Sequence, residues 1–337
     1  MKKNLIGFLG ISHLSMTYGL AFSSKNYNVN IYDKPSEIKK FYNNKKLLIR
    51  EPNFNSYFKK FRNNINFYSK VECLKECEII FLAKDIKTNK YGESFYEEIE
   101  NLLSNLKQIN TGSTLVVLSQ VYPGFTRKIK WPKKKLFYQV ETLIFGQALI
   151  RALKPERIIV GSNNKKNLLS KDFKILLKKF SRKILLMSYE SAELCKMSIN
   201  AYLISQITLT NKLNEVAGHL GAKWEDIKLA LNLDKRIGSF AYLKPGLGVS
   251  GGNLERDLFS LKKLCKTKKV NFDLFNVFQK YSKFYKDWVT QQIQKKMRLN
   301  LTISIIGLTY KINTNSTKNS PALSLLKKNY PCKFKIY

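Results

Sequence analysis

The segment NLIGFLGISHLSMTYGLAFSS, residues 4–24, joins a short apolar run to a glycine turn at Gly10 and then to a stretch of helical character. A second apolar run, NVNIYD, ends at Asp33, 23 residues after Gly10. A strand, a glycine turn, a helix and then an acidic residue at the end of the next strand form the pattern of a dinucleotide-binding unit. This segment therefore predicts a nucleotide-binding fold for the first part of the chain.

Further apolar runs follow at 78–83, 113–119 and 157–162, and amphipathic stretches separate them. Apolar runs of this length that alternate with helical patterns are typical of βαβ units. They predict an α/β fold with a Rossmann-like parallel sheet that helices cover on both faces.

The glycine turn departs from the usual fingerprint. Glycines in such a turn let the chain bend sharply and let a pyrophosphate approach the helix N-terminus. Gly7 and Gly10 are present, but Ser12 and Ser15 stand at the next two glycine positions. Ser12 puts a side chain where the pyrophosphate comes closest, although its hydroxyl has a proton to donate. Asp33 would hold the ribose hydroxyls and favour NAD over NADP; a turn that binds no nucleotide remains an open alternative.

The charge is strongly positive, with 60 Lys and Arg against 24 Asp and Glu and a formal net charge of +36. Such a charge suits a nucleic-acid binder, but the lysines are spread along the whole chain, which favours a general compositional bias. No apolar run approaches the about 20 residues of a membrane helix. Glycine, serine and histidine interrupt the apolar N-terminus, so we expect no secretory signal. Five cysteines without a CxxC pair and only two histidines predict a cytoplasmic protein without a metal site.

The second half of the chain is helical. From Ser191 to about His219 the pattern predicts one long helix, and from about Leu254 to Leu299 a second helical block. Strand character restarts near Leu301 with LTISIIGLTY. We expect three domains: a Rossmann-like domain at 1–188, a central helical domain at 189–298, and the start of a second Rossmann-like domain at 299–337.

Three ordered blocks carry a family resemblance. They read SAELCKMSINAYLISQITLTNKLNEVAGHLGA (191–222), LDKRIGSFAYLKPGLGVSGGNLERD (233–257) and GLTYKINTNSTKNSPAL (307–323). In this order they resemble signature blocks of the UDP-glucose/GDP-mannose dehydrogenase family, whose members oxidise the C6 hydroxyl of a nucleotide sugar to a carboxylate with two NAD. The resemblance implies NAD as cofactor, a UDP-sugar as substrate, a homodimer formed by the central helices, and a C-terminal domain that helps to hold the nucleotide.

The resemblance also implies a set of catalytic positions. Glu193, Lys196 and Asn200 are spaced i, i+3, i+7 and share one helix face. In the family, the lysine and asparagine at these places hold the developing oxyanion, and the aspartate at Asp257 assists proton transfer. Glu141 matches a glutamate of the family's PEFLREG-like segment. A solvated helix face is the alternative for the first three residues.

Other family positions have changed. Asn253 stands where the family has its nucleophilic cysteine, and a carboxamide cannot form the thiohemiacetal and thioester of the second oxidation. Phe145 stands where the family has the glutamate that is tied to thioester hydrolysis. The loss of both residues predicts that the second oxidation is impaired.

Binding positions carry over in part. For the cofactor, the resemblance implies Gly7, Gly10, Ser12, Ser15, Asp33, Lys34, Ser119, Gln120 (where the family has a threonine) and Lys318 (where it has an arginine). For the nucleotide sugar, it implies Arg236, Tyr242, Leu243, Gly246, Gly248, Gly251 and Lys311. Three functions remain open: a dehydrogenase limited to the alcohol-to-aldehyde step, an inactive relative that serves as a binding or oligomeric partner, and a basic nucleic-acid binder.

Overall fold

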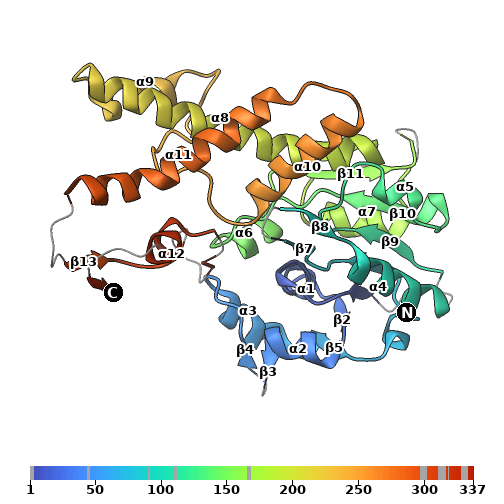
Figure 1. Cartoon of the computed structure of the whole chain (residues 1–337). Helices are drawn as coiled ribbons and strands as arrows, with labels where there is room; N and C mark the ends of the chain where they lie inside the picture. Colours follow the sequence, from blue (N-terminus) through green and yellow to red (C-terminus); the bar gives the residue numbers. More distant parts are fainter. Residues whose placement is uncertain are drawn as a thin grey trace. The chain divides into compact units, whose positions relative to one another are not determined.

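The computed structural model describes residues 4–43, 46–89, 92–109, 112–164, 168–296, 302–309, 316–317, 319–327 and 333–337. The chain forms two compact units (Figure 1). The first comprises Met1–Thr88 and Ser94–Lys196, and the second comprises Asn89–Glu93 and Met197–Tyr337. The division into three domains with boundaries at 188 and 298 stays a prediction.

The first unit is built on one eight-stranded sheet, with the spatial order β12-β11-β10-β9-β6-β1-β2-β5. Its strands are β1 (Leu5–Leu9), β2 (Asn28–Tyr32), β5 (Ile65–Tyr68), β6 (Ile79–Leu82), β9 (Thr114–Val117), β10 (Leu136–Gln139), β11 (Ile158–Ser162) and β12 (Ile184–Ser188). Counted along the chain, the first six strands of this sheet lie in the order 3-2-1-4-5-6, which is the order of the dinucleotide-binding fold. The predicted Rossmann-like sheet is confirmed.

One part of the sheet differs from the prediction, because β11 runs antiparallel to β10. The predicted parallel sheet therefore has one antiparallel pairing, between β10 and β11. A parallel neighbour needs a long crossover that returns the chain to the other end of the sheet. The connection between β10 and β11 contains only α6 (Ala148–Leu153), and a helix of this length spans about 9 Å. The chain therefore turns back beside β10, and β12 then pairs parallel with β11.

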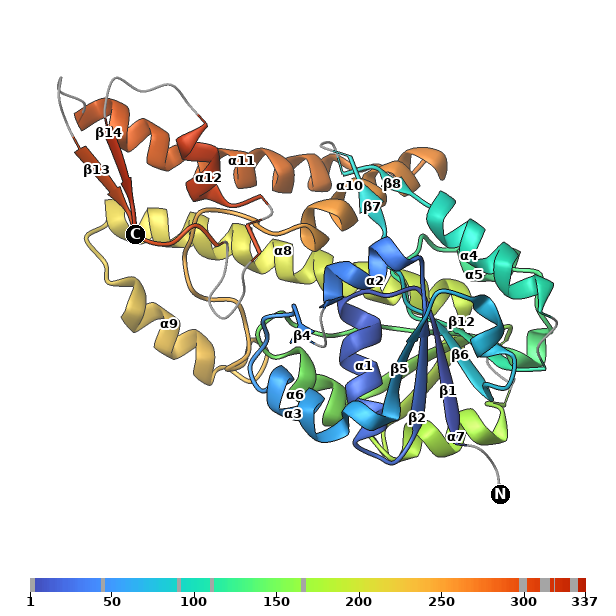
Figure 2. The ribbon, with the colours of Figure 1, turned by 90° about the horizontal axis from the view of Figure 1, so that it is seen from below.

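Helices cover both faces of this sheet, as the apolar pattern predicts. Ile6 and Phe8 of β1 belong to the same buried cluster as Leu20 of α1 (His13–Ser23). Leu9 belongs to a second cluster with Leu106 of α4 (Glu97–Gln108). Figure 2 shows α1 and α4 on opposite sides of the strands. Alternate side chains of one strand therefore build two separate cores.

Smaller elements complete the first unit. They are α2 (Pro35–Phe41), α3 (Phe54–Phe61), α5 (Phe125–Lys128), α7 (Lys171–Lys178), the short helices η1 (Arg62–Asn64), η2 (Val71–Leu74) and η3 (Lys133–Lys135), and the strand pairs β3 (Tyr42–Asn43) with β4 (Lys46–Leu47) and β7 (Lys87–Thr88) with β8 (Ser94–Phe95).

The second unit is mainly helical. It contains most of α8 (Tyr189–His219), then α9 (Trp224–Leu233), α10 (Asn253–Thr267), α11 (Asp273–Lys296) and α12 (Pro321–Leu326), and the parallel strands β13 (Thr302–Ile305) and β14 (Lys333–Ile336). A small core of Ile204, Val249, Leu258 and Phe278 holds the loop after α9 against the helices. The long predicted helix that ends at His219 is confirmed.

The helical block expected from about Leu254 to Leu299 consists, over its described residues, of the two helices α10 and α11. Lys269, between α10 and α11, has a φ of 56°. The Val270 N–H donates to the Cys265 carbonyl at 2.9 Å. A left-handed residue followed by such a bond is a common helix C-terminus, and Asp273 then begins α11.

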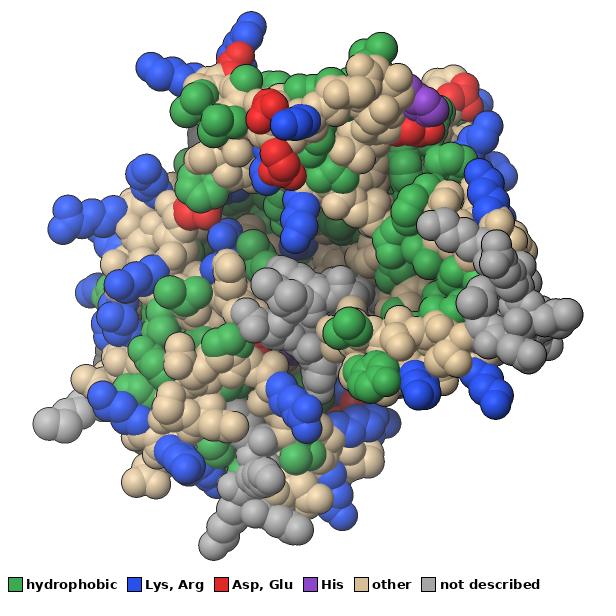
Figure 3. All heavy atoms as spheres, turned by 90° about the vertical axis from the view of Figure 1, so that its left-hand side faces the viewer, with side chains coloured by type: hydrophobic (Ala, Val, Ile, Leu, Met, Phe, Trp, Pro, Cys, Tyr) green, Lys and Arg blue, Asp and Glu red, His purple; other side chains and the backbone are tan. Residues whose placement is uncertain are grey.

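Basic side chains do not gather into one patch on the face drawn in Figure 3. On the face drawn in Figure 3, Lys and Arg side chains lie scattered around the surface with apolar and neutral side chains between them. Among the helices that the structure describes, none is both long and apolar enough to cross a membrane. The described residues also include no group of three or more His, Cys, Asp or Glu able to hold a metal ion.

Candidate active site

The glycine turn after β1 is tied to the end of β2. Gly10 has a φ of 95°, a conformation that side chains rarely adopt. Its N–H donates to the Tyr32 carbonyl at 2.9 Å. The next N–H, of Ile11, donates to Oδ2 of Asp33 at 2.8 Å. The acidic residue predicted to hold a ribose therefore also fixes the turn predicted to hold a pyrophosphate.

Ser12 serves as the N-cap of α1. Its Oγ accepts the N–H groups of Leu14 and Ser15 at 3.1 and 3.3 Å, and Ser15 Oγ accepts the Ser12 N–H at 2.8 Å. This reciprocal pair is a capping box. The Ser12 hydroxyl donates its one proton to the Ala83 carbonyl. The proton expected to be available to a phosphate oxygen is therefore bound to the backbone in this structure.

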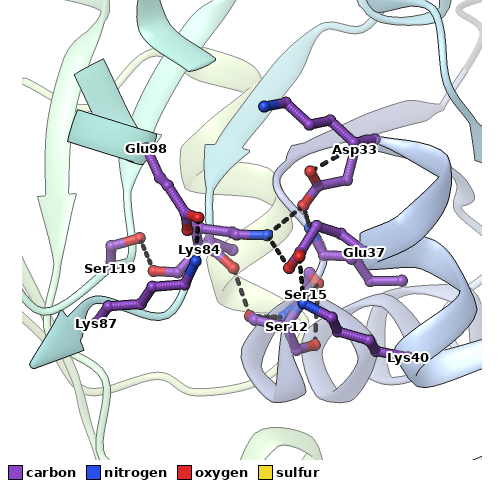
Figure 4. A network of polar contacts seen from close by, with 12 residues as sticks. Ser12, Ser15, Asp33, Glu37, Lys40, Lys84, Lys87, Glu98 and Ser119 are labelled. Carbon is purple, nitrogen blue, oxygen red and sulfur yellow. Dashed lines mark hydrogen bonds and ion pairs between the residues drawn. The ribbon is translucent and has the colours of Figure 1, made fainter. Parts of the chain in front are cut away.

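Lys84 lies at the centre of a buried polar network (Figure 4). It follows β6, and its Nζ lies 2.7 Å from Asp33 Oδ2 and 2.8 Å from Glu37 Oε2. Lys40 pairs with the other oxygen of Glu37. A Cβ at Gly10 would lie 2.9 Å from the Lys84 Cβ, so Lys84 packs directly on the glycine turn.

The charges of this network shift two pKa values. Burial alone would lower the pKa of Lys84, but hydrogen bonds to Asp33 and Glu37 outweigh it and raise the pKa. Hydrogen bonds from Lys40 and then from Lys84 lower the pKa of Glu37 to about 2. Both ions are therefore held in their charged forms at neutral pH.

The remaining cofactor candidates border this network. Ser119, after β9, donates its hydroxyl to the Lys84 carbonyl at 2.7 Å and is fully buried. The Lys34 N–H donates to Asp33 Oδ1 at 2.8 Å. Gln120 follows Ser119 in the chain, and Gly7 is a packing position because a Cβ there would lie 2.7 Å from Leu74. Lys318 lies outside the described residues.

The catalytic candidates on α8 are buried and have partners. In the first unit, Lys196 Nζ lies 3.2 Å from Glu141 Oε2. Glu193 accepts the N–H groups of Gly124 and Thr126, the latter at 2.9 Å. Burial raises the pKa of Glu193, and these hydrogen bonds oppose that effect. The alternative of a solvated helix face is wrong.

The second unit brings the other two catalytic candidates together. Asn200 donates its side-chain N–H to Asp257 Oδ2. Arg256 Nε lies 3.5 Å from the second oxygen of Asp257, whose residue is only 1% exposed. Asn253, the first residue of α10, precedes Asp257 by four residues and so lies on the same helix face. The position of the family cysteine is therefore one helical turn from the aspartate.

The glycine loop before α10 is shaped by a close backbone approach. Gly248 has a φ of 78°, and a Cβ there would lie 2.5 Å from the Ser282 carbonyl oxygen on α11. The Ser282 hydroxyl accepts the Val249 N–H at 3.0 Å. Gly246 donates its N–H to Asn211 Oδ1 at 2.8 Å. Packing against α11 therefore explains Gly248, whereas the bond from Gly246 to α8 uses only a backbone N–H, and Gly246 has open space around a Cβ.

The other substrate candidates also have internal partners. The Tyr242 carbonyl accepts the Thr210 hydroxyl at 2.8 Å, and the Leu243 carbonyl accepts the Trp224 indole N–H at 2.9 Å. The Gly251 carbonyl accepts a side-chain N–H of Asn319 at 2.9 Å. Arg236 is exposed and pairs with Asp234 at 2.6 Å. Lys311 lies outside the described residues.

Sequence reasoning missed two polar groups of the first unit. One is Lys84, whose signal is a lysine directly after the buried run IIFLA. The other is a pair in which His13 Nε2 lies 3.0 Å from Glu51 Oε1. Glu51 also accepts the Gly146 N–H at 2.9 Å, and the Phe145 ring lies 4.6 Å from the His13 ring. Nothing in the local pattern around Glu51 indicates this contact.

Comparison with known proteins identifies the family. Residues 4–181 match the UDP-glucose/GDP-mannose dehydrogenase family, NAD binding domain, and residues 190–283 match the central domain of the same family. The chain belongs to the UDP-glucose/GDP-mannose dehydrogenase family. NAD is the cofactor of this family's first domain and of this chain.

Individual relatives agree with this assignment. The UDP-glucose 6-dehydrogenase of Rickettsia prowazekii is 27% identical over 339 residues, which cover 95% of this chain and 77% of the relative. That of Campylobacter jejuni is 26% identical and covers 96% and 82%.

Solved structures share the fold. A UDP-glucose dehydrogenase from Pyrobaculum islandicum has a TM-score of 0.87 at 20% identity and covers 98% of this chain and 81% of its own. A UDP-D-ManNAc dehydrogenase from Pyrococcus horikoshii has a TM-score of 0.84 at 21% identity and covers 99% and 83%.

Proposed function

We propose that this chain is an NAD-dependent nucleotide-sugar dehydrogenase that oxidises the C6 hydroxyl of a UDP-sugar once and stops at the aldehyde. The observation that carries the proposal is the contrast between retained and lost groups. Lys196 and Asn200 lie on α8 with buried carboxylate partners, whereas a carboxamide, Asn253, stands at the nucleophile position.

The first unit fits NAD. Its strand order, the left-handed Gly10 and the carboxylate at the end of β2 are the features that hold a dinucleotide in this fold. Gly10, Ser12 and Ser15 would border the pyrophosphate, and Asp33 the adenosine ribose, with Lys34, Ser119 and Gln120 around them. NAD, when bound, accepts the hydride from C6.

The chain's own residues would stabilise the reacting oxygen. As the hydride leaves C6, negative charge grows on the sugar oxygen, and fixed donors that face it lower the barrier. The Lys196 ammonium is one such donor, and the Glu141 carboxylate 3.2 Å away keeps it in place. An asparagine amide has two N–H donors. Asn200 gives one to Asp257, which leaves the other for the sugar oxygen.

Asp257 is the group that we assign to the proton. Oxidation of an alcohol releases one proton and one hydride, so a base must take the hydroxyl proton, directly or through a water. The carboxylate of Asp257 is an acceptor, and its bonds to Asn200 and Arg256 fix its orientation. The same side chain therefore orients the oxyanion donor and receives the proton.

The chain lacks the two groups that the second oxidation requires, a thiolate nucleophile and a hydrolytic carboxylate. A thioester requires a thiolate nucleophile, and none of the five cysteines falls in the loop before α10. Phe145, at the position of the hydrolytic glutamate, contacts the His13 ring and offers no carboxylate. We therefore assign the aldehyde as the product.

The nucleotide part of the substrate would lie along the loop that precedes α10. We assign the contacts to Arg236, Tyr242, Leu243, Gly246, Gly248, Gly251 and Lys311. The Arg236 guanidinium is exposed, and Asp234 holds it in place, so it remains available to a phosphate.

We also propose that the chain forms a homodimer through α8. An exposed apolar stripe supports it: Tyr202 is 74% exposed, Leu209 61%, Leu213 42%, Val216 46% and Leu220 77%. Spacings of three, four and seven residues place Tyr202, Leu209, Leu213 and Val216 on one face of α8, and Leu220 follows its last residue. An exposed apolar face of this kind is typical of a protein–protein interface. The double variant Leu209→Lys/Leu213→Lys should lower the mass measured by light scattering to that of a monomer; an unchanged dimer mass would refute this interface.

The activity is tested with Lys196→Met. The folded enzyme should form NADH on addition of NAD and UDP-glucose, and Lys196→Met should remove this signal while NAD binding persists. Lys212→Met is the matched control, because Lys212 is an exposed lysine of the same helix, paired with Glu215; it should keep the rate. No NADH from the folded wild type would refute the proposal and leave the inactive binding relative.

A further inference from the structure

Lys84 lies where a dinucleotide would cross the sheet. It follows β6, whose Leu82 pairs with Leu9 of β1. The strand order reverses between these two strands, and ligands of such sheets bind at this switch point, beyond the carboxyl ends of the strands. Lys84 is only 5% exposed, and Figure 4 shows its side chain directed toward Asp33 and Glu37.

Most of the acceptor capacity of Asp33 is already used. Oδ2 accepts the Ile11 N–H at 2.8 Å and Lys84 Nζ at 2.7 Å, and Oδ1 accepts the Lys34 N–H at 2.8 Å. A carboxylate offers about four acceptor positions. The Asp33 side chain is 3% exposed. Two ribose hydroxyls therefore cannot both bond to Asp33 while Lys84 holds it.

The charge of Asp33 is also compensated. An acidic residue at the end of this strand favours NAD because it repels the 2′-phosphate of NADP. Here Lys84 lies within 3 Å of both Asp33 and Glu37, and Lys40 pairs with Glu37. Two ammonium groups thus balance two carboxylates, and Lys34 adds a further positive charge beside Asp33.

Lys84 has two carboxylate partners, so it can exchange one of them. If Lys84 leaves Asp33, its ammonium keeps the bond to Glu37 at 2.8 Å. A buried ammonium that keeps one carboxylate avoids the large cost of an unpaired charge, and Asp33 keeps the N–H groups of Ile11 and Lys34 as partners. Lys84 can therefore contact a phosphate group while it remains paired.

We propose that Lys84 determines cofactor selectivity in this chain: it covers and neutralises Asp33, so that the site discriminates only weakly between NAD and NADP. The proposal rests on the dinucleotide site described under the proposed function. It assigns to Lys84 a specificity role that the acidic residue alone would otherwise have.

The test measures dissociation constants of NAD and NADP for the full chain by isothermal titration calorimetry. For the wild type, the NADP-to-NAD ratio should stay below about tenfold. Lys84→Met exposes the charge of Asp33 to the 2′-phosphate and should raise the ratio at least about tenfold. Lys84→Arg keeps the charge and should keep the wild-type ratio. Lys87→Met is the control, because Lys87 is exposed and pairs with Glu98; its ratio should not change.

Lys84→Met removes the cation from the buried Asp33 and from the half-buried Glu37, which keeps only Lys40. Lys84→Met/Glu37→Gln removes one of these two carboxylates and provides a second variant with the same expected rise. An unchanged ratio in either folded Lys84→Met variant would overturn the selectivity role while the dinucleotide site stands. A wild type that already prefers NAD about 100-fold or more would overturn it as well. A folded wild type that binds neither dinucleotide would refute the dinucleotide site itself, and the selectivity role with it.

Discussion

Alanine in place of Gly248 would put a methyl group against the backbone of α11. The added Cβ would lie 2.5 Å from the Ser282 carbonyl oxygen, and the residue would keep a φ of 78°. The oxygen belongs to a helix backbone and not to the end of a flexible side chain, so it cannot turn away. Helix α11 or the loop must shift instead.

Two other glycines of this region allow the cost of the left-handed conformation to be measured apart from the cost of the close contact. Gly238 has a φ of 84° but open space around a Cβ, and Gly246 has open space and no positive φ. The left-handed conformation costs a residue with a side chain about 1–2 kcal/mol, and an overpacked contact costs about 1–3 kcal/mol. We expect Gly238→Ala to lose about 1–2 kcal/mol and Gly248→Ala about 2–5 kcal/mol. Gly246→Ala should be neutral or stabilise by up to about 1 kcal/mol.

Guanidinium unfolding, followed by circular dichroism, gives the free energy of unfolding of each variant. The expected order of stability is Gly246→Ala, then Gly238→Ala, then Gly248→Ala. If Gly248→Ala were as stable as Gly246→Ala, the close approach of the loop to α11 would be refuted.

Three further outcomes are expected. The pKa of Glu37 is lowered to about 2 from an ordinary value of 4.5, so its ion pairs stabilise the fold above about pH 4.5 and this stabilisation is lost as the pH falls through about 2. The difference in melting temperature between wild type and Glu37→Gln should therefore shrink from pH 6 to pH 2.5. A constant difference would contradict this expectation. Asp257→Asn should lower kcat at least about 100-fold, the usual scale of a lost general base, with NAD affinity unchanged by calorimetry; wild-type turnover would exclude Asp257 as the base. The double variant Asn253→Cys/Phe145→Glu should form more NADH per sugar than the wild type in an absorbance assay, and an equal yield would show that other groups block the second step.

The sequence predicts those parts of the fold that depend on local patterns. The run from β1 through Gly10 to α1 was predictable, because a short apolar run followed by a glycine and a helical stretch is a local pattern. The same holds for α8, whose long uninterrupted pattern ends at His219. The direction of β11 was not predictable, since it depends on how far the short α6 carries the chain. The break at Lys269 was missed because lysine gives no local signal for a left-handed conformation.

In the candidate site, too, local spacing was predictable and contacts between distant segments were not. The helical spacing placed Lys196 and Asn200 on one face of α8, but their partners Glu141 and Asp257 come from distant segments. Lys84 is 51 residues from Asp33 in the chain, so only the pairing of β6 beside β1 brings them together. Gly248 shows a glycine whose need arises from a neighbouring helix, which no local pattern reveals.

The central claim is that the oxyanion site works while the acyl chemistry is lost. The most direct measurement is the amount of NADH formed per UDP-glucose consumed, followed by the absorbance of NADH with excess enzyme and NAD. We expect about one NADH per sugar, because one hydride leaves for each alcohol oxidised to an aldehyde. About two per sugar would contradict the loss of the second oxidation, and none from a folded sample would contradict the dehydrogenase itself.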